Sequence, residues 1–176
     1  VLIIDFGSQV TKLIARRIRE LGVYSEVITP IELKRIRNYE NIKGLILSGG
    51  PSTVTTKKFQ TVPKEIFKKK IPILGICYGL QLIAKLFGGK IKPSKKRREF
   101  GRAHLTKLRS SLLIKKFINS KNSVWMSHED AVVKLPKKFK YYIKIIEFEM
   151  NFLICPIYKY YQQPYRHYLM HQWLDL

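Results

Sequence analysis

The chain has 176 residues, which suits one globular domain, and its net charge at pH 7 is +22. Such a charge is typical of nucleic-acid binding, but the sequence carries no DNA- or RNA-binding motif and its basic residues are scattered, so we expect no nucleic-acid partner. Its two Cys are far apart and no apolar run approaches the roughly 18 residues of a membrane span, so the composition favours a cytoplasmic protein without a disulfide framework. Because the chain opens on Val1 without an initiator Met, we also expect a fragment.

The first 90 residues alternate between predicted strands and predicted helices. Short apolar runs predict strands at 1–6, 24–28, 42–47 and 71–76. A helix is predicted over 10–21, ended by Gly22, with one apolar face toward the core: Val10, Leu13, Ile14, Ile18 and Leu21. A second helical pattern follows Cys77 and ends at Gly88-Gly89, and 66–70 are expected to end a further helix. This alternation predicts βαβ units with a mainly parallel sheet.

Three loops follow predicted strands, at 7–9, 48–51 and 77–79. Because ligands of a parallel sheet bind at the carboxyl ends of its strands, we expect these loops to meet there and to carry the chemistry.

Cys77 lies between the strand 71–76 and the helical pattern that follows it. A strand, a tight turn and a helix form the geometry of a nucleophile elbow, in which the helix N-terminus stabilises a thiolate. The alternative is a small buried core cysteine.

The loop 48–51 reads Ser-Gly-Gly-Pro, so its backbone N–H groups can face a ligand without a Cβ in the way. Together with the N–H of Tyr78 it would form an oxyanion hole beside Cys77, and acyl transfer becomes the natural reaction class. An ordinary turn is the alternative. Gln81 lies one helical turn after Cys77, where it either binds an amide substrate or is solvated. His128, in a polar stretch between apolar runs, is either a base or a packed or solvated residue.

Five segments taken together resemble the class I glutamine amidotransferases, and in particular their GMP synthase branch. The matching segments are 5–26, 47–51, 75–81, 99–103 and 124–128. They occur in order over about 1–140. The Glu-Phe-Gly of 99–101 and the Trp-Met-Ser-His of 125–128, with the Asp-Phe-Gly-Ser-Gln of 5–9, separate this branch from the anthranilate and carbamoyl-phosphate branches.

The resemblance implies a flavodoxin-like three-layer α/β sandwich and an enzymatic function. By this resemblance Cys77 attacks the side-chain amide of glutamine, Gly50 and Tyr78 supply the oxyanion hole, and Gln81, Ser127 and His128 hold the substrate. The ammonia released would pass to an ATP-using synthetase, fused or separate, that aminates XMP to GMP. No cofactor is expected in this domain; ATP and Mg²⁺ would bind to the synthetase.

The resemblance fails after Lys140. The family takes its base and orienting carboxylate from a His-Pro-Glu motif, which is absent here; His167 and His171 are the weak candidates for the base. All ten Gly lie at or before Gly101, so composition changes as well. We therefore divide the chain into an incomplete amidotransferase domain, 1–140, and a divergent tail, 141–176, that reflects a frame slip or a degenerate gene end. The alternative function is an inactive remnant or a glutamine-binding module.

Overall fold

The computed structural model describes residues 1–69, 71–93, 99–107, 123–128, 130–137, 139, 141–145 and 150–153. The chain forms two compact units, Val1–Gly89 and Lys90–Leu176. The division at residue 140 stays a prediction. None of the helices in the described ranges is long and apolar enough to cross a membrane.

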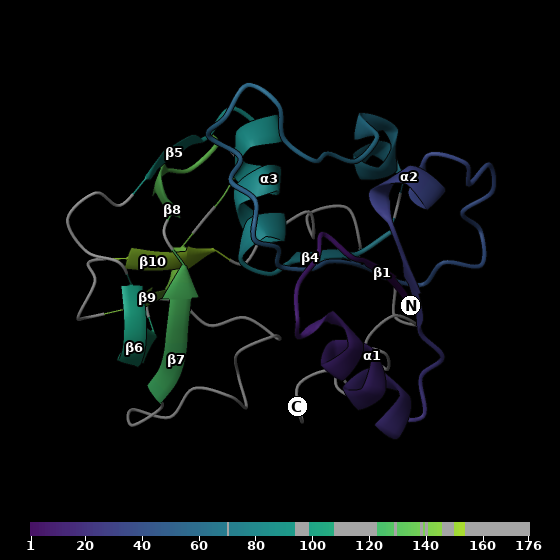
Figure 1. The fold of residues 1–176 in the computed structure, drawn as a ribbon, viewed down its shortest axis with the longest axis horizontal. Coiled ribbons are helices and arrows are strands. Elements are labelled where there is room, and N and C mark those ends of the chain that lie inside the picture. Colours follow the sequence, from purple (N-terminus) through teal and green to yellow (C-terminus); the bar gives the residue numbers. More distant parts are fainter. Residues whose placement is uncertain are drawn as a thin grey trace. The chain divides into compact units, whose positions relative to one another are not determined.

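A parallel sheet of four short strands forms the centre of the first unit (Figure 1). Its strands are β1 (Leu2–Ile4), β2 (Glu26–Ile28), β3 (Leu45–Leu47) and β4 (Ile73–Gly75). The order β2-β1-β3-β4 is that of a flavodoxin-like sheet. All residues of β1 and β3 are buried, as expected for strands covered on both faces.

The helices lie on both sides of this sheet. They are α1 (Thr11–Glu20), α2 (Pro30–Leu33), the 3₁₀ helix η1 (Lys64–Lys68) and α3 (Tyr78–Leu86). Figure 1 shows β1 and β4 between α3 and α1, so helix, sheet and helix form three layers. The predicted α/β fold class is confirmed. The sequence interpretation missed α2. This short helix begins with a capping box formed by Thr29 and Glu32.

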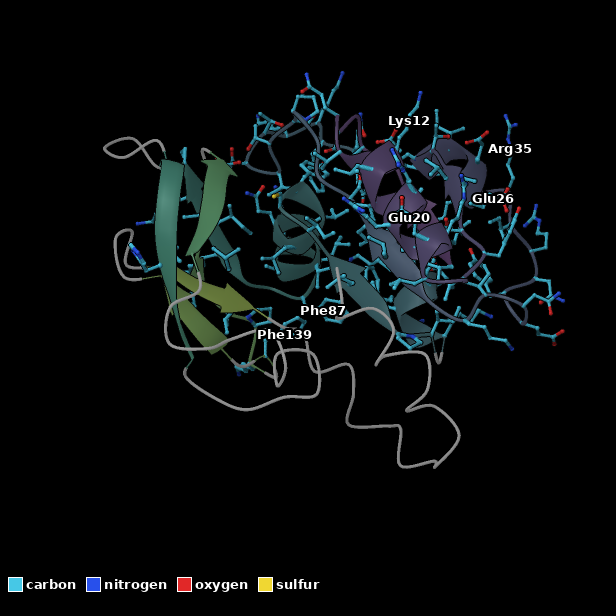
Figure 2. All side chains as sticks on the ribbon, turned by 90° about the horizontal axis from the view of Figure 1, so that it is seen from below. Lys12, Glu20, Glu26, Arg35, Phe87 and Phe139 are labelled. Carbon is cyan, nitrogen blue, oxygen red and sulfur yellow. The ribbon has the colours of Figure 1, made fainter. Side chains whose placement is uncertain are left out.

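The buried face of α1 differs from the predicted one. Thr11, Ala15 and Ile18 are buried, whereas Val10 and Leu13 are 47 % and 49 % exposed. The apolar pattern placed Val10 and Leu13 in the core and left out Thr11 and Ala15, because it gave no weight to a polar Thr or a small Ala. Lys12 and Glu20 lie on the exposed side of α1 (Figure 2).

The second unit is antiparallel. Its strands are β5 (Lys90–Pro93), β6 (Glu99–Lys107), β7 (Ser123–His128), β8 (Asp130–Lys134), β9 (Tyr141–Ile145) and β10 (Met150–Leu153). One sheet has the order β10-β9-β6-β7, and β5 pairs with β8 in another.

Candidate active site

The turn between β4 and α3 holds a cysteine in a backbone conformation that side chains rarely adopt. Cys77 has φ 48° and ψ −109° and is the N-cap residue of α3. Among the residues whose backbone is described, it is the one non-glycine residue with positive φ. Such strain is worth roughly 1–3 kcal/mol and collects at functional sites. The predicted strand, turn and helix are present, in the geometry of a nucleophile elbow.

Hydrogen bonds from the end of β3 hold this turn. The N–H of Ile76 donates to the O of Leu47 at 2.9 Å, and the N–H of Gly79 donates to the O of Ser48 at 3.0 Å. These two bonds lie on either side of Cys77 in the chain. The strained residue is therefore fixed relative to the neighbouring strand rather than left to relax.

The loops after three strands meet around Cys77, as the sequence predicts. A Cβ built on Gly49 would lie 3.6 Å from the Cβ of Cys77 and 3.4 Å from the Oγ of Ser8. A Cβ built on Gly7 would lie 3.3 Å from the Cδ of Pro51. The residues from all three loops are thus within van der Waals reach of one another.

Gly50 packs against the chain at the end of β1. A Cβ there would lie 2.5 Å from the O of Phe6 and 2.9 Å from its Cβ, so no side chain fits without displacing the backbone. Gly49 is buried and Gly50 is half-buried. The predicted donor Gly50 therefore directly follows the residue that contacts Cys77.

The side chain of Tyr78 belongs to the core and leaves only its backbone for substrate. The ring is 1 % exposed, lies 4.9 Å from the ring of Phe6, and its hydroxyl donates to the O of Gln60 at 2.6 Å. Burial raises the pKa of the Tyr78 hydroxyl. Tyr78 is the first residue of α3, where backbone N–H groups have no acceptor within the helix.

Gln81 is 7 % exposed, so it is not the solvated side chain that the sequence left open. Its backbone N–H donates to the O of Cys77 at 3.0 Å and closes the first turn of α3. Its contact with a substrate amide stays a prediction.

Burial and the helix terminus act in opposite directions on the thiol. The side chain of Cys77 is exposed, yet the surrounding protein atoms exclude enough water to raise the pKa of the thiol above its ordinary value. The positive end of α3 favours the thiolate and opposes this shift. In the described part of the chain, desolvation is the cause of the shift and no cationic side chain offsets it. Desolvation thus favours the protonated thiol, and a base is needed to form the attacking thiolate.

A polar cluster lies beside the three loops, and the sequence interpretation missed it. The Oδ1 of Asp5 accepts hydrogen bonds from the N–H groups of Gly7 (2.9 Å) and Ser8 (3.2 Å) and from the hydroxyl of Thr11 (2.8 Å). The hydroxyl of Thr11 also lies 3.1 Å from the Oγ of Ser48, and both of these side chains are fully buried. The one available signal was that a polar residue directly follows each of two parallel strands: Asp5 follows β1 and Ser48 follows β3.

The other predicted site residues lie outside the first unit. Ser127 and His128 end β7, where they pair in register with Phe100 and Glu99 of β6. His167 and His171 fall outside the described residues, so their role as a base stays a prediction. The described ranges contain no group of three or more His, Cys, Asp or Glu that could hold a metal ion.

Comparison with known proteins decides the family. The model of the family "Glutamine amidotransferase class-I" matches residues 2–152. The chain belongs to the class I glutamine amidotransferases. The resemblance seen in the sequence motifs is thereby confirmed, and the nucleophile elbow lies within the matched region.

The curated relatives of this amidotransferase chain are much longer than the chain itself. GMP synthase [glutamine-hydrolyzing] of Borreliella burgdorferi (strain N40) is 51 % identical over 144 residues, which are 80 % of this chain and 27 % of that protein. The Petrotoga mobilis protein of the same name is 49 % identical over 140 residues, with 80 % and 27 % covered. The chain therefore spans about a quarter of the length of these relatives.

Solved structures share the fold. A Thermoplasma acidophilum protein described as a subunit of GMP synthase superposes with a TM-score of 0.71 at 24 % identity, covering 99 % of this chain and 91 % of that one. A glutamine amidotransferase from Thermotoga maritima gives a TM-score of 0.64 at 22 % identity, with 85 % and 68 % covered. At these identities the likeness establishes the three-layer fold.

Proposed function

We propose that this chain is the glutaminase part of a GMP synthase, releasing ammonia from glutamine for the amination of XMP to GMP. The observation that carries the proposal is the strained Cys77 at the N-terminus of α3, in contact distance of the glycine loop 48–51. The name shared by the curated relatives supports the choice of GMP synthase within the family.

In this proposal the thiolate of Cys77 attacks the side-chain carbonyl carbon of glutamine. The carbonyl oxygen becomes an oxyanion, which the N–H groups of Gly50 and Tyr78 stabilise. The C–N bond then breaks, ammonia leaves after taking up a proton, and water hydrolyses the γ-glutamyl thioester to glutamate. The sequence resemblance assigns the binding of glutamine to Gln81, Ser127 and His128.

The ammonia would be consumed by an ATP-using synthetase. About three quarters of the length of the curated relatives lies beyond the region that matches this chain, and we assign the ATP and Mg²⁺ sites to that part. The chain would thus need a synthetase partner, either a fused domain or a separate protein, to form GMP.

A second candidate is a remnant that binds glutamine without hydrolysing it. The sequence favours it by one observation, the absence of a His-Pro-Glu motif from residues 141–176. The raised pKa of Cys77 makes this absence more serious, because a protonated thiol depends on a base.

A chloroketone analogue of glutamine tests the proposal. It should label Cys77, spare Cys155, and be slowed by added glutamine, because the proposal places the glutamine site at Cys77. The Cys77→Ala variant is the matched control and should not be labelled. Labelling that glutamine does not slow, or equal labelling of Cys155, would exclude a glutamine site at Cys77. Glutaminase turnover of the untreated chain then separates the enzyme from the remnant.

A further inference from the structure

We propose that Ser48 is a positioning residue for acyl transfer at Cys77. Its hydroxyl fixes the Gly49–Gly50 peptide so that the N–H of Gly50 is presented to the developing oxyanion. The inference rests on the proposed function and deepens it. Ser48 directly follows β3 and is fully buried, and its Oγ donates to the O of Gly49 at 3.0 Å.

The geometry of a peptide unit links this hydrogen bond to the oxyanion hole. The peptide between Gly49 and Gly50 is trans, so its C=O and N–H point in opposite directions. Holding the O of Gly49 toward the buried Ser48 therefore turns the N–H of Gly50 away from it, at a residue that is only half-buried. Two successive glycines leave the peptide free to rotate, so an external anchor is needed to set its orientation.

The neighbours of Ser48 set the direction in which its proton points. Its Oγ accepts from the N–H of Phe6 at 3.3 Å and from the hydroxyl of Thr11 at 3.1 Å. Thr11 shares its single proton with the carboxylate of Asp5, at 2.8 Å. Because Asp5 is the nearer acceptor for the Thr11 proton, the N–H of Phe6 is the firm donor to Ser48, and the O of Gly49 accepts the Ser48 proton at 3.0 Å.

The peptide that Ser48 holds lies next to the nucleophile. The position of a Cβ on Gly49 is 3.6 Å from the Cβ of Cys77, so a rotation of this peptide changes the surface that faces the thiol. Removing one oxyanion-hole donor typically slows acyl transfer by about 10²–10³-fold. Removing its anchor leaves the donor present but no longer oriented, so we expect a smaller loss, of about 10-fold or more.

The γ-(4-nitrophenyl) ester of glutamate measures this effect in the full chain. At alkaline pH the Cys77 thiolate bonds to the ester carbonyl carbon, the C–O bond breaks, and nitrophenolate departs with the electron pair. No proton has to be supplied to the leaving group, so the burst of nitrophenolate reports acylation without a catalytic acid. Ser48→Ala should lower the acylation rate constant about 10-fold or more while changing the half-saturating ester concentration little.

Alkylation by iodoacetamide is the second readout, because the loss of a residue with a merely structural role would slow this reaction as well. That reaction displaces iodide at a saturated carbon and forms no oxyanion. Cys77 of the Ser48→Ala variant should therefore be alkylated within about twofold of the original rate, because the loss is confined to the transition state of acyl transfer. Equal losses in both reactions would overturn the proposal, since they would mean that Ser48 only maintains the fold around Cys77.

Two further variants complete the experiment. Ser25→Ala is the matched control, because Ser25 is also buried and its Oγ also donates to a backbone O, that of Ala15, at 3.0 Å. It lies before the start of β2, at the opposite edge of the sheet from the loops, and should acylate at the original rate. Thr11→Val keeps Ser48 and the side-chain shape, and should lower acylation in the same direction as Ser48→Ala.

The outcomes separate the two levels of the proposal. If Ser48→Ala and Thr11→Val both acylate at the rate of Ser25→Ala, Ser48 does not position the peptide and the inference is wrong. If the unaltered chain gives no burst at Cys77, the proposed function itself fails and the inference fails with it. Circular dichroism verifies that each variant is folded, and Thr11→Val decides the question should Ser48→Ala not fold.

Discussion

Replacing Gly79 by alanine should push α3 away from β3. Gly79 is buried in the first turn of α3, and its N–H donates to the O of Ser48 at 3.0 Å. A Cβ at this position would collide with the carbonyl O of Leu47 and would lie 2.6 Å from its carbonyl carbon. Leu47 is fully buried in β3, an interior strand of the sheet, so neither backbone can move alone.

The magnitude follows from the kind of contact. Overpacking of a core typically costs about 1–3 kcal/mol, and a clash between two backbones belongs at the upper end, about 3 kcal/mol. For a chain of this size that loss corresponds to a fall in Tm of about 6–12 °C. Because Cys77 lies two residues before Gly79, the ester acylation described above should slow as well.

Thermal unfolding followed by circular dichroism measures the effect, with Gly22→Ala as the matched control. Gly22 has φ 75° and nothing within 4 Å of an added Cβ, so alanine there meets backbone strain without a clash. That strain costs roughly 1–2 kcal/mol. Should Gly79→Ala unfold at the same temperature as Gly22→Ala or above it, the close approach of α3 to β3 would be refuted.

Three further predictions concern the reactivity of Cys77 and its surroundings. Burial raises the pKa of the Cys77 thiol, so its alkylation by iodoacetamide should increase with pH along a curve whose midpoint lies above that of a free cysteine. A midpoint below that of a free cysteine would show that the α3 terminus outweighs desolvation. Lys85 holds the loop 52–61, because it donates to the O of Val54 and its Nζ lies 4.2 Å from the ring centre of Phe59. Lys85→Met should therefore speed proteolysis of this loop, whereas Lys12→Met on the exposed side of α1 should not. Equal proteolysis of the two variants would refute the role of Lys85. Lacking the His-Pro-Glu motif, the chain should turn over glutamine roughly 10⁴-fold or more below the rate of an intact triad, and a purified chain with fast turnover that Cys77→Ala abolishes would refute this.

The elbow around Cys77 and the ends of the helices could be predicted from the sequence, because each depends only on residues that are close together in the chain. The strand, turn and helix around Cys77 follow from an apolar run, a break and a 3.6-residue period, all within a short stretch of chain. Gly22 and Gly88 end the helices where predicted, and both have positive φ. The family was also readable from the sequence, because its motifs are short and occur in a fixed order.

Strand lengths and the buried face of α1 required the tertiary structure. The predicted strand 71–76 is reduced to Ile73–Gly75, the residues that stand in register opposite Leu45–Leu47 of β3. Thr11 faces inward because its hydroxyl bonds to Asp5 and to Ser48, which is 37 positions away in the chain. No periodicity within one helix contains that information.

The arrangement of the site divides in the same way. Its residue types, a cysteine at an elbow and a Gly-Gly loop, could be predicted because each is a local backbone requirement. That Gln81 is buried, that Gly50 fits only against Phe6, and that the hydroxyl of Ser48 reaches the O of Gly49 were decided by the packing of α3 and β1 against β3. These contacts join segments that are distant in sequence, and only the order and register of the parallel strands bring them together.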